Sequence, residues 1–574
     1  MMEDRIQDLY NTWLNSKCID EADREELRGI ANDPKEIEER FYKDLEFGTG
    51  GMRGIRGVGT NRINKYMIGK ATQGLANYML SVDAEAAREK GVAIAYDCRI
   101  GSTEYALTTA LVLAANGIKA YLFESLRSTP ELSFAVRELG AQAGVVVTAS
   151  HNPVEYNGYK VYWNDGAQIV DPHATGVVES VNGVTDLEMI KMISEEEAKE
   201  KGLLHMIGKD LDDKYIETIK GEVLNSEIEG KKDFKIVYSP LHGTGRVAVQ
   251  RVMAEAGFES VYTVAEQEMP DGTFPTCSYA NPEDPAVFEL GIKLAEKKGA
   301  NICMANDPDA DRIGIAVKTK EGEWIYPNGN QVGLLLMNYI LENRKDIPAN
   351  GAVISTVVST PMLDVVAADK NVKVMRTLTG FKFIGEKIKE FEEGKLDGTY
   401  LFGFEESYGY LIGTHARDKD AVVTTLLIAE MAAKYAAEGT SIPEKLEELY
   451  EKYGYYKEGI SAITKGGKSG AEEIAAIMTK LRDNTPVELA GQRVAILRDF
   501  KLQTEKDMIA GTEAKLDLPS SNVIQFVLED GTHITARPSG TEPKIKYYYG
   551  VKADSAEAVD AKLTDTMKKF EAAL

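Results

Sequence analysis

The feature that most constrains the fold is a repeated alternation of short apolar runs with longer helical patterns. Runs such as GVAIAYD, IKAYLF and AGVVVTAS are bounded by Gly, Pro or Asp, and helical patterns such as STEYALTTALVLAANG separate them. This alternation is typical of β-α-β units that build a mostly parallel sheet with both faces covered. It returns in FKIVYSPL, SVYTVAE and ANICMAND, and again in GAVISTVVS, VKVMRTLTG and GTYLFGFEES. We therefore predict three successive α/β domains with mixed, mostly parallel sheets.

The last part of the chain has a different pattern. RVAILRDF, NVIQFVLEDGTHITARPSG and KIKYYYGVK indicate strands and precede a helix from about Ser555, which predicts a C-terminal α+β domain. A length of 574 residues agrees with about four domains of roughly 150 residues each. We place the domains at residues 1–208, 209–322, 323–453 and 454–574, and we expect them to surround a central cleft.

Composition limits the partners of the chain. Asp and Glu number 91 against 67 Lys and Arg, so the net charge of −24 argues against nucleic acid or an anionic membrane as a partner. Four widely spaced cysteines form neither a zinc signature nor a disulfide framework. The N-terminus lacks a signal-peptide pattern, and the apolar runs are shorter than the roughly 18 residues of a spanning helix. We expect a cytoplasmic protein, and its oligomeric state is left open.

The loop ANDPDADRIGIAV carries three carboxylates at alternate positions, Asp307, Asp309 and Asp311. Three oxygen ligands so spaced converge on one cation if the loop curls, whereas three unpaired carboxylates that close together repel one another. A solvated acidic turn is the alternative, but apolar runs on both sides indicate buried strands. An EF-hand would need Gly and Glu where this chain has Arg312 and Lys318. We predict a metal site, and magnesium suits three carboxylates that leave positions for water or phosphate oxygen.

The stretch VVVTASHNPVEYNGYK brings Ser150, His151 and Asn152 to the end of an apolar run. Asn-Pro and Asn-Gly are ordinary turn dipeptides, so a strand end followed by a turn is the simplest interpretation. A Ser-His catalytic pair is disfavoured, because neighbours on an extended chain point in opposite directions and no G-x-S-x-G elbow surrounds Ser150. A phosphorylated Ser150 is the better hypothesis, since its oxygens would bind the metal while His151, Lys160 and a nearby Arg balance its remaining charge.

Two further loops carry groups suited to sugar and phosphate. In FGFEESYGYLIGTHARDKDA, Glu405 and Ser407 lie two residues apart and would face the same way on an extended segment, which suits two vicinal hydroxyls. A charged surface turn is the alternative there. In ARPSGTEPKIK, a guanidinium fork, two hydroxyls and a close backbone approach suit a phosphate dianion, and a plain turn is again the alternative. These groups belong to Arg537, Ser539, Gly540 and Thr541.

Four of these motifs occur in a characteristic order, one in each expected domain: TASHNP, DPDADR, GFEES and RPSGTEP. With FGTGGMRG near the start, they closely resemble the signature loops of the α-D-phosphohexomutase superfamily, and the likeness covers essentially the whole chain. The chain most resembles the bacterial members of this length that interconvert α-D-glucose 1-phosphate and glucose 6-phosphate, and the related phosphopentomutases. The resemblance implies an intramolecular phosphotransferase of the isomerase class. It also assigns one loop to each domain, in the order phosphoserine, metal, sugar and phosphate.

The resemblance implies roles for individual residues. Ser150 would be the phosphoserine carrier and a metal ligand, and the Mg²⁺ would be held with it by Asp307, Asp309 and Asp311. The side chains that would surround the phosphoserine are Arg53, His151 and Lys160. The residues that would bind the sugar or its non-transferring phosphate are Thr379 and Gly380 of TLTGFKF, Glu405, Ser407, Arg417, Arg537, Ser539, Gly540 and Thr541. Arg312 and Lys382 would lie near the site.

One position departs from part of the superfamily. Where the phosphomannomutase-phosphoglucomutase branch has a His shortly after the Glu-x-Ser pair, this chain has Gly409. The sequence RDKD at residues 417–420 resembles instead the Arg-x-Lys-Asp of other members. Lys419 is therefore the candidate general base, with a surface lysine as the alternative.

The activity expected from the resemblance is transfer from phosphoserine 150 to a hexose monophosphate, which gives glucose 1,6-bisphosphate as the intermediate and activator. The intermediate then turns over and returns its other phosphate to Ser150. The partners would be small-molecule sugar phosphates. Phosphopentomutase or phosphomannomutase activity is an alternative within the enzyme class, and a phosphosugar-binding sensor without turnover is an alternative outside it. The intact Ser150 and the three aspartates argue against the sensor.

Overall fold

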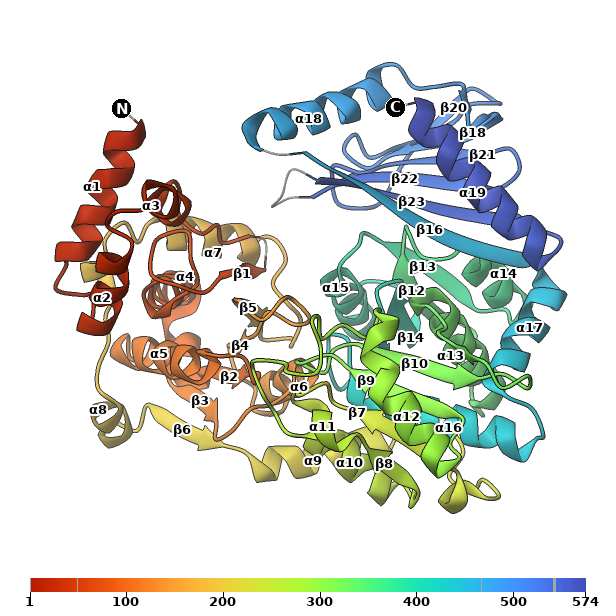
Figure 1. Cartoon of the computed structure of the whole chain (residues 1–574), viewed down its shortest axis with the longest axis horizontal. Coiled ribbons are helices and arrows are strands. Elements are labelled where there is room, and N and C mark those ends of the chain that lie inside the picture. The colour runs from red at the N-terminus through yellow and green to blue at the C-terminus, as the bar shows by residue number, and fades with distance from the viewer. Residues whose placement is uncertain (1, 49, 466, 540–543, 574) are drawn as a thin grey trace. The chain divides into compact units, whose positions relative to one another are not determined.

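The computed structural model describes residues 2–48, 50–465, 467–539 and 544–573 (Figure 1). The chain forms two compact units. The first unit contains Met1–Asn328, Ile384–Leu396 and Ser407–Glu438. The second contains Gly329–Phe383, Asp397–Glu406 and Gly439–Leu574. Among the described helices, those long enough to cross a membrane are too polar to do so.

The first sheet, in the first unit, has the strand order β1-β5-β4-β2-β3-β6. Strands β2, β3, β4 and β6 run parallel, whereas β5 pairs antiparallel with both β4 and β1. β2 and β4 are buried along their whole length, as expected for central strands covered on both faces. The elements are α1 (Met2–Asn15), α2 (Glu21–Gly29), α3 (Pro34–Phe41), β1 (Gly51–Ile55), α4 (Lys65–Lys90), β2 (Val92–Tyr96), α5 (Ser102–Ala115), β3 (Ala120–Phe123), α6 (Thr129–Glu138), β4 (Ala143–Val147), β5 (Tyr156–Trp163), α7 (His173–Asn182), η1 (Leu187–Met189), α8 (Glu195–Glu200) and β6 (Leu204–Ile207).

The second sheet also lies in the first unit, with the order β11-β10-β9-β7-β8. β7 is parallel to β8 and β9, and β10 returns antiparallel beside β9. The elements are α9 (Lys209–Lys220), η2 (Lys231–Asp233), β7 (Ile236–Ser239), α10 (Gly245–Glu255), β8 (Val261–Thr263), α11 (Ala265–Glu268), η3 (Pro285–Phe288), α12 (Glu289–Lys298), β9 (Ile302–Asn306), β10 (Ile313–Lys318) and β11 (Trp324–Ile325).

The third block of alternating elements is divided between the two units. In the second unit, β12 pairs in parallel with β13 and β14. The elements are α13 (Gly329–Asn343), β12 (Gly351–Thr356), α14 (Met362–Asp369), β13 (Lys373–Thr377), α15 (Phe381–Glu392), β14 (Thr399–Glu405), β15 (Gly409–Ile412), α16 (Ala421–Ala437) and α17 (Ile442–Tyr453).

The C-terminal block is a mostly antiparallel sheet in the second unit, with the order β16-β23-β22-β21-β18-β19-β20 and β17 beside β18. The predicted α+β character is confirmed, and the C-terminal helix begins one residue after Ser555. The elements are β16 (Tyr455–Thr464), α18 (Gly467–Asp483), β17 (Glu488–Leu489), β18 (Gln492–Asp499), β19 (Thr504–Asp507), β20 (Thr512–Lys515), β21 (Ile524–Leu528), β22 (His533–Pro538), β23 (Lys544–Ala553) and α19 (Ala556–Ala573).

The expected fold class is confirmed, and its strand ends position the polar loops. β4 ends at Val147 and β9 ends at Asn306, so the TASHNP and DPDADR loops both follow the carboxyl end of a buried strand. Ligands of open α/β sheets lie at this edge. Helix α6 begins nearby at Thr129, where the Ser128 hydroxyl caps the helix by accepting the N–H of Glu131 at 3.3 Å.

Candidate active site

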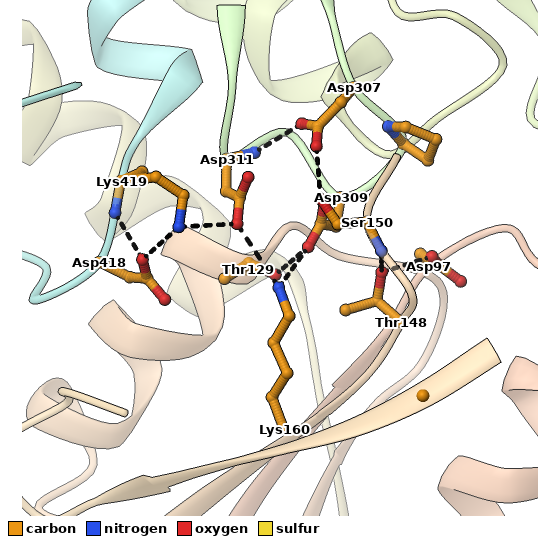
Figure 2. Close-up of polar contacts among 12 residues, drawn as sticks. Asp97, Thr129, Thr148, Ser150, Lys160, Asp307, Asp309, Asp311, Asp418 and Lys419 are labelled. Atoms are coloured by element: carbon orange, nitrogen blue, oxygen red, sulfur yellow. Dashed lines mark hydrogen bonds and ion pairs between the residues drawn. The ribbon is translucent and has the colours of Figure 1, made fainter. Parts of the chain in front are cut away.

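Ser150 lies in the loop after β4 and is buried, with 6% of its surface exposed. Its φ of 50° is in the left-handed region, which residues other than glycine seldom adopt. Its N–H donates to the Thr148 hydroxyl at 2.8 Å, and its own Oγ donates to Oδ2 of Asp307 at 2.7 Å. Figure 2 shows Ser150 beside the acidic loop. The first two α/β blocks therefore meet at this serine.

The side chains of His151 and Ser150 lie closer together than we expected from the sequence. Its Nδ1 is 3.2 Å from Oγ of Ser150. The expectation that the two side chains point apart was wrong, because the left-handed backbone at Ser150 breaks the extended chain on which it depended. Burial lowers the pKa of His151, and the charges of Arg312 and Arg53 lower it further. The ring is therefore neutral near pH 7 and can exchange one hydrogen bond with the serine.

Three carboxylates of the DPDADR loop converge. Asp307, Asp309 and Asp311 each present an oxygen within 4.8 Å of the others, and all three side chains are buried. The loop curls because Ala310 adopts a φ of 52°, and because the N–H groups of Asp311 and Arg312 both donate to Oδ1 of Asp307, at 3.1 and 3.0 Å. The curl expected from the alternate spacing is present.

The donor set of this loop fits a divalent cation. Oδ1 of Asp309 and Oδ1 of Asp311 are buried and receive no hydrogen bond from the residues that the structure describes. Burial raises the pKa of Asp307 well above its ordinary value, and the charges of Asp309 and Asp311 raise it further. A cation would relieve both the repulsion and the unmet acceptors, and carboxylate oxygens are the ligands that hard divalent ions prefer. The triad could therefore hold a metal ion.

Two lysines from different blocks approach the same carboxylates. Nζ of Lys160, on β5, is 2.9 Å from Oδ2 of Asp309 and 3.5 Å from Oδ2 of Asp311. Nζ of Lys419 is 3.1 Å from Oδ2 of Asp311. Burial lowers the pKa of Lys160, but Asp309 and Asp311 outweigh it, and the pKa is raised overall. Both side-chain nitrogens point into the acidic cluster in Figure 2, where the Lys160 ammonium can neutralise an anion bound beside Ser150.

Asp418 holds Lys419 in place. One carboxylate oxygen, Oδ1, accepts both the N–H of Lys419 at 2.8 Å and its Nζ at 2.9 Å. The other oxygen accepts the hydroxyl of Tyr162 at 2.6 Å. Lys419 is 9% exposed, so it is not the surface lysine that the sequence left as an alternative. Its role as a general base stays a prediction.

Two arginines lie at the margin of this cluster. Arg53, on β1, donates to Oδ1 of Asn152 in the Ser150 loop at 3.0 Å. Arg312 donates to Glu283 at 3.1 Å, and its Nε lies 3.7 Å from Oδ1 of Asp311. Both guanidinium groups are thus in contact with residues of the Ser150 loop or of the aspartate triad, and both charges lower the pKa of His151.

Arg417 has different surroundings. Its side chain is fully buried, its Nη1 donates to the carbonyl oxygen of Ala416 at 3.1 Å, and its Nη2 forms an ion pair with Glu392. Its backbone N–H donates to the Ser133 hydroxyl at 2.8 Å. These contacts are typical of an arginine that stabilises a loop, and its predicted contact with substrate stays a prediction.

The predicted sugar loops meet in the second unit. Glu405, the last residue of β14, is buried and accepts the N–H of Gly380 at 2.7 Å, while Thr379 beside Gly380 is half-buried. Nζ of Lys382 lies 5.2 Å from the centre of the Phe383 ring. The expected extended segment after Glu405 was wrong, because residues 406–408 form a turn with a φ of 63° at position 408.

Ser407 belongs to the first unit and is half-buried, so it and Glu405 are assigned to different units. Glu406 accepts the hydroxyls of Thr356 and Ser359, at 2.8 and 3.2 Å. Sequence reasoning did not single out Glu406 from Glu405, because two adjacent glutamates carry no signal of where the strand ends, and the structure ends β14 between them.

Arg537 lies near the end of β22 and is half-buried. Its Nη1 donates to the hydroxyl of Tyr548 at 3.5 Å. Burial raises the pKa of Tyr548, and so does the charge of Glu406, whereas Arg537 lowers it, so these groups are neighbours in the second unit. The N–H of the exposed Ser539 donates to the carbonyl oxygen of Lys544 at 2.7 Å. The predicted positions Gly540 and Thr541 lie outside the described residues.

Several residues around Ser150 were missed by sequence reasoning. Thr129 donates its hydroxyl to Oδ2 of Asp309 at 2.8 Å and its N–H to the carbonyl oxygen of the same residue at 2.9 Å. Asp97 and Arg99, after β2, form a buried pair behind the Ser150 loop. The available signal was the polar sequence YDCRIGS directly after an apolar strand, the same position that singled out the Ser150 and Asp307 loops.

Comparison with known proteins agrees with this arrangement. Three segments match families described as phosphoglucomutase/phosphomannomutase alpha/beta/alpha domains I, II and III, at residues 44–188, 213–322 and 328–453. The phosphoglucomutase of Staphylococcus epidermidis is 34% identical over 564 residues, which are 97% of this chain and 100% of that protein. The phosphoglucomutase of Staphylococcus aureus is 36% identical over 550 residues, 95% of this chain and 97% of that protein.

Solved structures share the fold. A phosphoglucomutase/phosphomannomutase family protein from Burkholderia thailandensis has a TM-score of 0.66 at 19% identity, covering 92% of this chain and 98% of that one. Parafusin from Paramecium has a TM-score of 0.65 at 18% identity, covering 92% and 95%. The fold and the loops thus define a phosphohexomutase, an intramolecular phosphotransferase. The chain belongs to the phosphoglucomutase/phosphomannomutase family.

Proposed function

We propose that this enzyme interconverts α-D-glucose 1-phosphate and glucose 6-phosphate through a phosphoserine at position 150 and a glucose 1,6-bisphosphate intermediate. The observation that carries the proposal is the 2.7 Å contact of Ser150 Oγ with Asp307, inside a cluster of three carboxylates and two lysines. Phosphoryl transfer needs positioning and charge neutralisation more than covalent help, and this cluster supplies both. The names of the Staphylococcus relatives support glucose as the sugar.

In the first half-reaction the Oγ–P bond of phosphoserine 150 breaks, and a P–O bond to the free hydroxyl of the glucose monophosphate forms. The hydroxyl proton passes to the amine of Lys419, and Asp418 and Asp311 stabilise the ammonium that results. Lys160 neutralises charge on the phosphoryl oxygens. Bound Mg²⁺, held by Asp307, Asp309 and Asp311, would supply a Lewis acid beside the Ser150 oxygen.

In the second half-reaction, Oγ of Ser150, which left the phosphoryl group as an alkoxide, attacks the other phosphate of the bisphosphate and becomes phosphorylated again. Lys419 returns its proton to the sugar oxygen that is released, so protons and phosphate balance over the cycle. His151, kept neutral by burial and nearby cations, can hold the serine oxygen by one hydrogen bond without competing for the phosphoryl group.

Substrate contacts are assigned by the family resemblance. Glu405 and Ser407, with Thr379 and Gly380, would bind the sugar hydroxyls. The non-transferring phosphate would be bound by Arg537, Ser539, Gly540 and Thr541, with Arg417 and Lys382 near the site. We place the enzyme in the cytoplasm, since the four cysteines are free.

A coupled assay tests the proposal. Glucose 1-phosphate, mannose 1-phosphate and ribose 1-phosphate would be compared with magnesium and glucose 1,6-bisphosphate present. We expect the highest kcat/KM for glucose 1-phosphate. A higher value for ribose or mannose 1-phosphate would contradict the assignment of glucose, and no turnover of any of the three would contradict mutase activity.

A further inference from the structure

The backbone of Ser150 needs support from elsewhere in the fold. A φ of 50° places Ser150 in the left-handed region, where the Cβ of a non-glycine residue crowds the following carbonyl oxygen. Such strain persists only where the surrounding structure imposes it. Neighbouring groups must therefore hold Ser150 in this conformation, with its Oγ directed at the aspartate triad. A role for these groups rests on the proposed function, because it concerns the transfer of phosphate to and from this oxygen.

Arg99 binds the Ser150 loop through its carbonyl groups. Its Nη2 donates to the carbonyl oxygen of Ser150 at 2.6 Å and also to that of Asn152. Its Nη1 donates to the carbonyl oxygens of Pro153 and Tyr156, at 2.8 and 3.0 Å. A planar guanidinium is suited to this task, because its donors point in fixed directions from one rigid group. One side chain thus satisfies four carbonyl groups in the chain from residue 150 to residue 156.

Asp97 supports the same loop through Thr148. Its Oδ2 accepts the Thr148 hydroxyl at 2.6 Å, and the oxygen of that hydroxyl accepts the N–H of Ser150 at 2.8 Å. Its Oδ1 accepts the Ser102 hydroxyl at 2.8 Å and the N–H of Arg99 at 2.9 Å. The N–H and the carbonyl group of Ser150 are therefore both tied to residues that follow β2.

The three residues of this clamp, Asp97, Arg99 and Thr148, are 2%, 3% and 1% exposed. Residues 272–274, in the loop between α11 and η3, pack against this clamp. The Arg99 guanidinium lies 5.1 Å from the centre of the Phe274 ring. A side chain at Gly272 would meet the carbonyl oxygen of Cys98 at 2.5 Å, so this loop is packed directly on the clamp. Groups so enclosed have little freedom to move when Ser150 gains or loses its phosphate.

We propose that Asp97, Arg99 and Thr148 are positioning residues that hold Ser150 in its left-handed conformation and so aim its Oγ at the phosphoryl group. They touch neither substrate nor metal. Their contribution is to the rate of transfer, because misplacement of a reacting oxygen by about 1 Å can cost as much as a hundredfold in rate. Sugar binding does not depend on them in this account.

The test uses Thr148→Val, which keeps the shape of the side chain and removes the hydroxyl that links Asp97 to Ser150. Phosphate uptake from glucose 1,6-bisphosphate would be followed by rapid quench and intact mass, beside steady-state kinetics and thermal unfolding. We expect uptake to slow by about tenfold or more, with the final phosphate per chain and the KM for glucose 1-phosphate unchanged. Thr148→Ser, which retains the hydroxyl, should restore most of the rate.

A purely structural role predicts a different result. Thr148→Val would then lower the unfolding temperature and the final fraction of chains that accept phosphate, while the rate constant stayed at the wild-type value; that result overturns the proposal. Thr148→Ser as slow as Thr148→Val would overturn it too, since the hydroxyl would not be the cause. If Thr148→Val does not fold, Arg99→Lys carries the same expectation, because one ammonium cannot reach four carbonyl groups. Wild-type protein that accepts no phosphate at Ser150 would contradict the proposed function instead.

Discussion

At the scale of residues, strained backbone and charged side chains occur together in the TASHNP and DPDADR loops. Ser150 and Ala310 have φ values of 50° and 52°, and Asp307, in the same loop as Ala310, accepts the hydroxyl of Ser150. Strained backbone of this kind costs about 1 to 3 kcal/mol per residue and occurs mainly at functional sites. Neither conformation could be predicted from the sequence, because a positive φ at Ser or Ala has no local signal.

Asp309→Asn tests the metal assignment. The substitution removes one charge from the triad and leaves Lys160 without its shorter ion pair. The magnesium concentration for half-maximal activity should rise at least about tenfold, since even the loss of a partner outside the ligand set commonly costs that much. Asp346→Asn removes an exposed carboxylate and serves as control. Activity of wild type that persists unchanged in excess chelator would contradict a metal at this site.

Lys419→Met tests the general base. Removal of the amine should lower kcat far more than it raises KM, because the proton leaves the sugar hydroxyl in the transition state. Lys434→Met, at a partly exposed lysine on α16, is the matched control. The measurement is the pH dependence of kcat for the two variants. If kcat and its pH profile match the wild type, Lys419 does not take the proton.

At the scale of elements, the apolar runs were sufficient to predict the central strands. β2, β4, β7 and β9 are buried throughout, and burial on both faces is what produces a continuous apolar run. β5, which carries Lys160, was missed because Asn157-Gly158 is an ordinary turn signal. Gly158 lies within the strand for another reason, since a Cβ there would stand 2.5 Å from the carbonyl oxygen of Thr148.

The long-range contacts of the site could not be predicted from the sequence. The sequence pattern indicated which polar loops follow strand ends, and it therefore predicted Ser150 and the aspartate triad as site residues. The Thr129 contact with Asp309 joins positions 180 residues apart, and the Tyr162 contact with Asp418 joins positions 256 apart. No periodicity or spacing in a single sequence carries such pairings.

Asp420→Ala tests the element that presents Lys419. Asp420 caps α16 by accepting the N–H groups of Val422 and Val423, and it also accepts the hydroxyl of Tyr215 at 2.9 Å. Loss of this buried network should lower the free energy of unfolding by about 3 kcal/mol or more. Denaturant unfolding would be compared with Ser194→Ala, which removes the cap of the exposed helix α8 and should cost about 1 kcal/mol. If both variants lose the same free energy of unfolding, Asp420 stabilises the fold only as a helix cap, and its other buried hydrogen bonds contribute nothing.

At the scale of the whole molecule, the residues with proposed roles in phosphoryl transfer and in substrate binding belong to different units. Ser150, the triad, Lys160 and Lys419 lie in the first unit, and Glu405, Gly380 and Arg537 lie in the second. With a net charge of −24, the chain as a whole repels a sugar phosphate, so attraction must come from local cations. Substitutions in the second unit should therefore change substrate binding and leave the phosphorylation of Ser150 possible.

Arg537→Ala tests this division. It should remove a charge-assisted contact worth about 1.5 to 3 kcal/mol, which corresponds to a rise in KM of roughly tenfold or more for glucose 1-phosphate and glucose 6-phosphate alike. Ser150 should still accept phosphate. Arg493→Ala, at an exposed arginine of the same unit, is the control. An unchanged KM in both directions would place the non-transferring phosphate elsewhere.

The central claim is that Ser150 carries the phosphoryl group, and intact mass measurement tests it most directly. Wild type, Ser150→Ala and the exposed control Ser520→Ala would be incubated with glucose 1,6-bisphosphate and magnesium, then weighed and assayed for mutase activity. We predict one phosphate per chain and turnover in wild type and in Ser520→Ala, and neither in Ser150→Ala, because the transfer cycle has no other carrier. A Ser150→Ala protein that gains the phosphate or keeps near-normal turnover would contradict the account.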